Sequence, residues 1–310
     1  MVVAKERIIL SAQSATLERP TENKMKKLMM TLALCGLAIN ALAAPQAVVE
    51  AVQSPAWRDR DGRAQPLAPG MELLSRDRVR TGDGSRAYLR LADGSTVKLG
   101  ENAVLLAERL GPHERQFFSA ALDVAKGAFR FTTDKLRKLS RRDVTIRVAT
   151  VTAGIRGTDI WGKTEPERDF VCLLEGRITV SHKDGDTREM SEPLTFYVAP
   201  RNQPPKGIEA ADPATVKKWA EETEIQAGAG VLRRGGKWKL LLADTDNQAS
   251  ALEVYDLAAI AGYAASIRPR IVGEAIRYQI LLRNLPNKAE AEALAVRVKT
   301  RLGLEARPTR

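Results

Sequence analysis

The last part of the chain, residues 237–310, contains a strand–helix–strand pattern twice in succession. Short apolar runs alternate with segments whose apolar residues recur at helical spacing, and Gly262 and Gly303 stand where the two helices should end. The expected elements are a strand at 238–243, a helix at 248–262, a strand through Ile267, a strand at 276–282, a helix at 288–302 and a closing strand at 304–307. This order predicts a small α+β domain of four antiparallel strands with two helices on one face, which leaves the other face free to bind something.

This C-terminal pattern resembles the sporulation-related repeat, or SPOR domain. The residues that carry the resemblance are the strand at Trp238, the segments 258–263 and 278–280, and the segment 289–294 with its continuation at 302–304. The resemblance implies a βαββαβ, ferredoxin-like plait that binds peptidoglycan glycan strands stripped of their stem peptides. The first strand of such domains often reads aromatic-x-Val-Gln-x-Gly, whereas Leu241 and Ala243 stand here in place of the Gln and the Gly.

Side chains alternate between the two faces of a strand, so the helix-covered and exposed faces of this domain can be assigned. The exposed set in the first and third strands is Lys239, Leu241, Arg277, Gln279, Leu281 and Arg283. Arginine and glutamine side chains suit carboxylates and acetamido groups, and leucines can pack on sugar faces. We expect these six residues to form the glycan-binding site; the alternative is a solvated sheet with ordinary surface arginines.

The N-terminus has the three-part form of a secretory signal peptide. Lysines at positions 24, 26 and 27 precede an apolar run at 28–38 and a small-x-small motif at 41–43. These features predict a signal peptide at 25–43, and they make residues 1–24 an upstream extension. A cleaved signal peptide places the protein in the periplasm. The alternative is an uncleaved anchor, in which case the chain would stay attached to the membrane.

Composition agrees with a secreted, basic protein. The formal net charge is +11, and of the two cysteines only Cys172 follows the predicted signal peptide, which leaves no intramolecular disulfide. Cys172 lies in an apolar run at 170–174, which favours a buried and inert thiol. In that compartment the positive charge favours acidic envelope polymers or anionic headgroups as partners over nucleic acid.

The region 47–200 is predicted to be an all-β domain, because short alternating runs are broken by Gly-containing turns. The runs include 87–91, 96–99, 144–148 and 177–180, and the turns include 81–84, 92–95 and 183–186. Five segments in this region, taken in order, resemble the FecR-type periplasmic domain: 79–85, 89–99, 127–131, 152–159 and 175–180. The resemblance implies a solenoid-like or sandwich-like extracytoplasmic domain.

In FecR-type signalling proteins this domain receives a signal from an outer-membrane receptor and controls a sigma factor across the inner membrane. That role needs a cytoplasmic sigma-binding module, and residues 1–24 are too few to fold as one. The sequence therefore favours a non-catalytic envelope protein that binds denuded glycan strands through the SPOR domain. The FecR-type domain would then bind or sense an unidentified envelope protein. The alternative is an extracytoplasmic signal-transduction regulator of the FecR sigma-regulator type.

A linker at 201–236 separates the two predicted domains. Asp212 is an N-cap candidate ahead of Pro213, which predicts a short helix at 213–224 that packs through Val216 and Trp219. The glycine-rich stretch 227–236 indicates a flexible tether.

No pattern for catalysis, a cofactor or a metal stands out. The two histidines, His113 and His182, are far apart and lack metal-ligand spacing. Two distant carboxylates of the glycosidase kind would leave no spacing signal, so that alternative stays open. We read the turn Arg156-Gly157-Thr158 as structural, and we expect a protein that is not an enzyme.

Overall fold

The computed structural model describes residues 45–113, 117–134, 142–182 and 187–310. The predicted signal peptide at 25–43, the extension at 1–24 and the turn at 183–186 lie outside the described residues. No helix within the described ranges is long and apolar enough to cross a membrane. Residues 44–310 belong to one compact unit.

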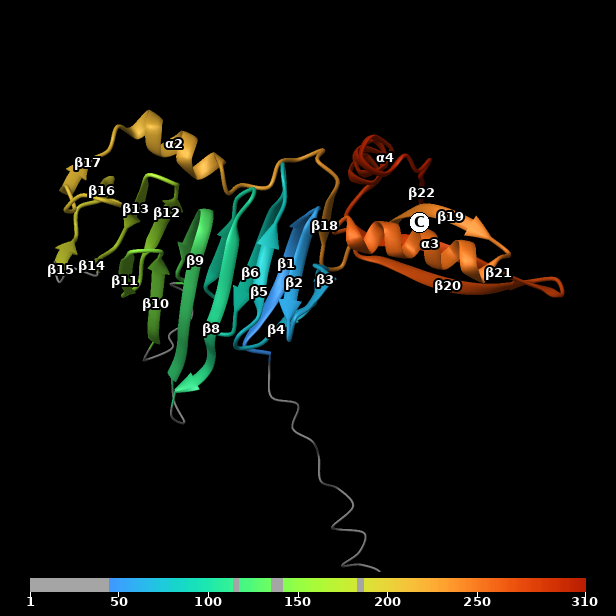
Figure 1. The fold of residues 1–310 in the computed structure, drawn as a ribbon, viewed down its shortest axis with the longest axis horizontal. Coiled ribbons are helices and arrows are strands. Elements are labelled where there is room, and N and C mark those ends of the chain that lie inside the picture. The colour runs from blue at the N-terminus through green and yellow to red at the C-terminus, as the bar shows by residue number, and fades with distance from the viewer. Residues whose placement is uncertain (1–44, 114–116, 135–141, 183–186) are drawn as a thin grey trace, which may run out of the picture. The chain divides into compact units, whose positions relative to one another are not determined.

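Most of this unit is built from β-strands arranged in two sheets (Figure 1). The first sheet contains β1 (Ala47–Gln53), β4 (Glu72–Leu73), β6 (Arg86–Leu91), β7 (Thr96–Leu99), β12 (Asp159–Thr164), β13 (Arg168–Glu175), β16 (Thr195–Pro200), β17 (Gly207–Ala210) and β18 (Val231–Arg233). The second contains β2 (Ala56–Arg60), β3 (Arg63–Pro66), β5 (Arg78–Thr81), β8 (Val104–His113), β10 (Arg142–Val148), β11 (Val151–Ile155), β14 (Ile178–His182) and β15 (Thr187–Met190).

The long strand β9 (Phe117–Thr132) belongs to both sheets. Its first part pairs with β8 and, in parallel, with β10, whereas its last residues pair with β7 and β12. Alternating side chains from both sheets form one continuous core, in which Phe129, Phe131 and Ile146 are fully buried. The prediction of an all-β region is therefore confirmed, including the hairpin between β6 and β7. The resemblance left a solenoid-like or a sandwich-like architecture open, and the structure has two sheets joined through β9.

Helix α2 (Pro213–Glu221) covers the outer surface of the first sheet. It begins as expected, because the Asp212 carboxylate accepts a hydrogen bond from the Thr215 N–H, but it ends three residues earlier than predicted. Trp219 stacks on Trp161 of β12, with ring centroids 5.3 Å apart and planes 4° apart. Cys172 is fully buried in the same cluster, as predicted, and burial raises the pKa of its thiol to about 12.

The segment after α2 is fastened to the sheet by one carboxylate. Glu224 accepts hydrogen bonds from the Tyr88 hydroxyl at 2.6 Å, from Lys98 Nζ at 2.5 Å and from Arg130 Nη1 at 3.3 Å. Tyr88 also accepts from the Ile225 N–H at 2.7 Å. Because the three partners of Glu224 come from β6, β7 and β9, this residue ties the segment to three neighbouring strands.

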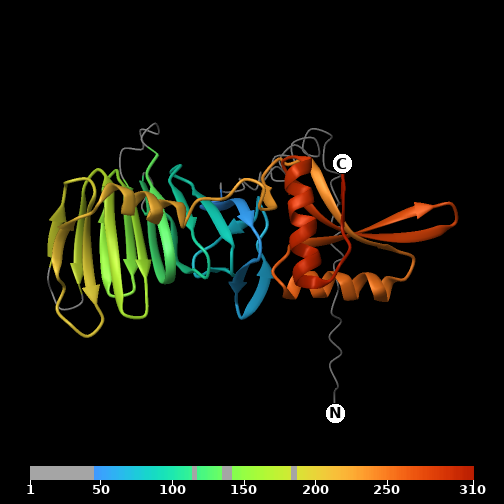
Figure 2. The same cartoon turned by 90° about the horizontal axis from the view of Figure 1, so that it is seen from above.

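The C-terminal part has the predicted βαββαβ topology. Its elements are β19 (Trp238–Thr245), α3 (Gln248–Ile260), β20 (Ala265–Val272), β21 (Ala275–Leu285), α4 (Lys288–Leu302) and β22 (Arg307–Thr309). The strand order is β20-β21-β19-β22, all pairs are antiparallel, and both helices pack on one face of the sheet (Figure 2). Helix α4 has the predicted bounds and ends at Gly303, which adopts φ 69°.

The glycine-rich stretch at 227–236 differs from the flexible tether that the sequence predicts. Its residues 231–233 form β18, which pairs with β1. The buried carboxylate of Glu290 on α4 accepts hydrogen bonds from the N–H groups of Gly228, Gly230 and Val231 at 2.7, 2.8 and 2.9 Å. The stretch is therefore held on both sides, and the C-terminal domain is docked rather than tethered. Composition alone could not reveal this, because the partners of the stretch lie far away in the chain.

Candidate functional site

Four of the six residues predicted to bind glycan lie together. Lys239, Leu241, Gln279 and Leu281 line one hollow of about 470 Å³ on the sheet face opposite the helices. Arg270 of β20 and residues 307–310 at the C-terminus complete its lining. The hollow therefore has an aliphatic floor and a strongly basic wall, which suits a polar ligand that carries negative charge.

Two of the predicted hydrogen-bond donors on this face are already engaged by Asp244. Arg277 donates to the Asp244 carboxylate through Nε at 2.7 Å and to the Asp244 carbonyl oxygen through Nη2 at 3.0 Å. Gln279 donates to the same carboxylate at 2.9 Å. The hydrogen bond from Gln279 and the pairing with Arg277 hold the pKa of Asp244 below its ordinary value. A ligand at this site would meet the Asp244 network rather than two free side chains.

The two leucines of the site are less available than predicted. Leu241 and Leu281 lie on the face opposite the helices, as expected, yet both are buried. They form the floor of the hollow, below the surrounding basic side chains. A sugar ring is therefore expected to contact the basic side chains of the wall rather than to stack on either leucine.

Arg283 does not line the hollow that Lys239, Leu241, Gln279 and Leu281 share. The register between β19 and β21 shifts between Trp238 and Leu240, and Asn284 adopts φ 69° at this irregularity. Arg283 instead lines a separate hollow with Tyr255 and Ala259 of α3. Strict alternation, on which the predicted faces rest, does not indicate an irregularity of this kind.

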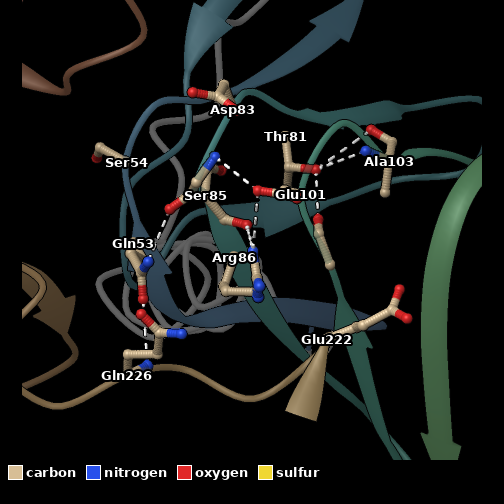
Figure 3. Close-up of polar contacts among 12 residues, drawn as sticks. Gln53, Ser54, Thr81, Asp83, Ser85, Arg86, Glu101, Ala103, Glu222 and Gln226 are labelled. Carbon is tan, nitrogen blue, oxygen red and sulfur yellow. Dashed lines mark hydrogen bonds and ion pairs between the residues drawn. The ribbon is translucent and has the colours of Figure 1, made fainter. Parts of the chain in front are cut away.

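A second candidate site surrounds the turn that joins β5 to β6 (Figure 3). Thr81 accepts from the Ala103 N–H at 2.9 Å and donates to the Gly100 carbonyl at 2.7 Å. The Glu101 carboxylate accepts from the Gly84 N–H at 3.0 Å. This network fixes the turn against the loop that follows β7.

The same turn is joined to β1 and to the linker through Gln53. The buried Gln53 side chain donates to the Gly84 carbonyl at 2.7 Å and accepts from the Gln226 N–H at 3.2 Å. Both contacts are visible in Figure 3. One glutamine thus connects the turn with a segment more than a hundred residues away in the sequence.

Beside this turn, Arg86 is buried with incomplete hydrogen bonding. Its side chain is 10% exposed, Nη1 donates to the Ser85 carbonyl at 2.8 Å, and the nearest Glu101 oxygen is 3.9 Å away. Among the described residues, Arg86 Nε and the hydroxyls of Ser54 and Ser85 have no hydrogen-bond partner. Arg86 lines a hollow of about 510 Å³ together with Lys126 and other charged residues. Three of the ten such atoms among the described residues lie together at this turn, which makes the turn a candidate for interaction.

Helix α4 of the C-terminal domain contacts this turn directly. Arg297 donates through Nη2 to the carbonyl oxygens of Ser54 at 2.9 Å and Gly84 at 3.2 Å. Arg301 donates to the Asp83 carbonyl at 2.9 Å. Burial lowers the pKa of Arg297, as expected for a guanidinium that is only partly solvated. The turn is therefore held between the sandwich and α4.

Comparison with known protein families assigns the region that contains this turn. Residues 77–180 match the model of the FecR protein family. The chain contains a FecR domain. The match begins one residue before β5, includes the turn at 81–86 and β9, and ends within β14. It lies within the predicted range 47–200, and the additional strands around it belong to the same two sheets as the FecR domain.

Comparison with solved structures finds only distant similarity. Two crystal structures of an anti-sigma factor candidate from Parabacteroides distasonis ATCC 8503 are similar at 15% sequence identity, with TM-scores of 0.37 and 0.36. The similarity covers 73% of this chain and 92% or 91% of the other. No curated protein matches the sequence. The FecR match does not extend to residues 237–310, and none of these comparisons supports the SPOR resemblance.

Asp244, Arg297 and Arg301 are among the residues of the candidate sites that sequence reasoning missed. Asp244 lies at the end of a strand and Arg297 and Arg301 lie on α4, where charged residues ordinarily face solvent. The i, i+4 spacing of the two arginines was a signal that they share one face of the helix. It could not indicate what that face contacts.

Proposed function

We propose that this protein is a non-catalytic signal-transduction regulator of the FecR type that works in the periplasm. The observation that carries this proposal is the FecR domain. Its matched residues include the turn at 81–86, which makes hydrogen bonds with β1, with the loop after β7 and with α4. A signal received at the domain surface can reach this turn through either the sandwich or α4. The partner that this role implies in the periplasm is an envelope protein that delivers the signal; the regulator of transcription that responds to it lies across the inner membrane.

The docking of the C-terminal domain supports a regulatory role over a purely structural one. Arg297 and Arg301 contact backbone carbonyls of the turn, and such contacts depend on the exact course of the turn. A change of conformation at 81–86 would therefore change how α4 is held. Coupling of this kind needs two arrangements with different contacts, and the polar atoms left without partners around Arg86 are those that a second arrangement or a partner could satisfy.

The test is the transcript profile of cells with and without this protein. We expect its loss to change one coherent group of genes that share a sigma-factor promoter, and we expect the intact gene to restore them. Overproduction of residues 44–310 behind a secretion signal should shift the same group. A profile in which no sigma-dependent group responds to either change would argue against the proposal.

A second candidate function is binding of peptidoglycan glycan strands by the C-terminal domain. The observation that favours it is the hollow shared by Lys239, Gln279 and Arg270, whose basic wall suits lactyl carboxylates and acetamido oxygens. This function is compatible with the first, because the hollow lies on the sheet face opposite the helices and α4 makes the contacts with the turn.

This second function is tested by co-sedimentation with amidase-treated sacculi. The Lys239→Ala, Arg270→Ala double variant removes two basic side chains that line the hollow. We expect it to lose most of the binding while its melting temperature stays within a few degrees of the parent. Arg283→Ala is the matched control, since Arg283 lines a different hollow. Equal sedimentation of all three proteins would rule out this face as a glycan site.

A further inference from the structure

The hairpin formed by β20 and β21 continues beyond the sheet of the C-terminal domain (Figure 2). The two strands pair with each other as far as Val272 and Ala275. The pairing of β19 with β21 ends earlier, at Thr245 and Tyr278. The last residues of the hairpin, 271–277, therefore form a two-stranded ribbon that pairs with neither β19 nor β22.

Three large aliphatic side chains are exposed at this tip. Ile271 is 81% exposed, Val272 is 56% exposed and Ile276 is 51% exposed. Ile271 and Ile276 are direct partners across the ribbon, so their side chains share one face. That face continues the apolar side of the sheet, where Ile267 and Ile280 pack against the helices. The tip is thus an apolar surface with nothing from the core covering it.

Basic residues lie directly behind the tip. Arg268 and Arg270 are exposed on β20, and Arg277 lies opposite Arg270 on β21. At about 3.3 Å per residue, Arg270 is only about 7 Å from Val272. Arg277 is held by Asp244, whereas Arg268 and Arg270 extend from the exposed half of the strand. Within the ribbon the one acidic residue is Glu274, in the turn.

We propose that this ribbon inserts its tip into an anionic lipid surface. The length of the apolar tip matches the depth, about 5–10 Å, to which apolar side chains enter the boundary between headgroups and acyl chains. At that depth the arginines lie level with the lipid phosphates. A protein partner is the less suitable occupant, because three side chains at the end of a narrow ribbon offer far less surface than a stable protein interface buries. Arg277 behind the tip is paired with Asp244, but the exposed Arg268 and Arg270 are complementary to acidic headgroups.

Vesicle flotation tests this inference with purified protein, and all variants share the same N-terminus so that residues 1–43 contribute equally. We expect the parent to float with phosphatidylglycerol vesicles and not with phosphatidylcholine vesicles. The Ile271→Asn, Ile276→Asn double variant should bind at least tenfold more weakly. Replacing Arg268 or Arg270 by Gln should weaken binding about fivefold each, and the effect should shrink as salt is added.

Ile260→Asn is the matched control, because Ile260 is 80% exposed but lies at the end of α3 rather than in the ribbon. It should float like the parent. The proposal is overturned if the tip variant floats as well as the parent, or if the parent fails to float with anionic vesicles. The second result would point to a protein as the partner of the tip. Neither outcome bears on the role of the FecR domain, which the transcript profile tests separately.

Discussion

Arg297 donates a hydrogen bond from Nη2 to the carbonyl oxygen of Ser54 at 2.9 Å, across 243 positions of the sequence. Ser54 follows β1, whereas Arg297 lies in the middle of the last helix. The same Nη2 reaches Gly84 in the turn of the FecR domain. A single guanidinium therefore joins the start of the β-sandwich, the β5–β6 turn and the C-terminal domain.

The carboxylate of Glu290 should be a major source of stability for this arrangement. Glu290→Gln keeps the size of the side chain but leaves one carbonyl oxygen to serve three backbone N–H groups. We expect a loss of about 2 kcal/mol in the free energy of unfolding, since hydrogen bonds to a charged group are worth about 1.5–3 kcal/mol. Urea unfolding measures it. Glu292→Gln on the exposed side of α4 is the control and should change stability little.

Close approach between the linker and α4 predicts different outcomes at two glycines. Gly230 and Gly235 both have positive φ, at 74° and 84°, so alanine is strained by about 1 kcal/mol at either position. A Cβ at position 230 would also lie 2.8 Å from the Leu294 backbone, whereas at position 235 it would meet nothing within 4 Å. Gly230→Ala should therefore cost about 2 kcal/mol more than Gly235→Ala. Equal melting temperatures for the two variants would contradict the docked position of α4.

Glu224 predicts a pH-dependent contribution to stability. Burial opposes its ionisation, but hydrogen bonds from Lys98 and Tyr88 outweigh that effect and hold the pKa of Glu224 below its ordinary value of 4.5. A lowered pKa in the folded state gives stability that is present above the unfolded pKa and lost as the pH falls. The difference in melting temperature between the parent and Glu224→Gln should therefore be largest near neutral pH and shrink below about pH 4.5. A difference that stays constant down to pH 3 would contradict this assignment.

Cys172 should report on whether α2 stays packed. With the pKa of its thiol raised to about 12, Cys172 should react very slowly with Ellman's reagent at pH 8 in the folded protein. Trp219→Ala removes the ring that stacks on Trp161 above the same cluster, and it should increase the reaction rate. Lys218→Ala, one position away on the exposed side of the helix, is the control. Fast labelling of the parent would show that α2 does not protect this surface.

Local sequence signals predicted the elements well where those elements are regular. The alternation in 87–91 and 96–99 predicted β6 and β7, and the bounds of α4 follow from its helical spacing and from Gly303. The all-β character of the region 47–200 was also predictable from its turns and short strands, whereas its division into two sheets was not. These features are determined by residues that are close in the sequence, so residue spacing is enough to predict them.

The parts that sequence reasoning missed depend on contacts between distant residues. The glycines at 228 and 230 indicate a flexible segment until the Glu290 carboxylate is placed against their N–H groups. Likewise, the irregularity at Asn284 turns Arg283 away from the predicted site, although no residue type there breaks the alternation. Asp244 had no predicted role because its partners, Arg277 and Gln279, lie on another strand.

The central claim is that the FecR domain and the docked C-terminal domain act as one regulatory unit. It is tested by expression of a reporter from a promoter that responds to loss of this protein, in cells that carry the parent, Arg301→Ala, Arg297→Ala with Arg301→Ala, or Lys299→Ala. Lys299 lies on α4 but pairs with Glu305, so its variant is the control. At equal protein levels and with melting temperatures within a few degrees, we predict that the two arginine variants fail to restore the reporter and that the parent and Lys299→Ala restore it. Full restoration by the Arg297→Ala, Arg301→Ala double variant would contradict the claim.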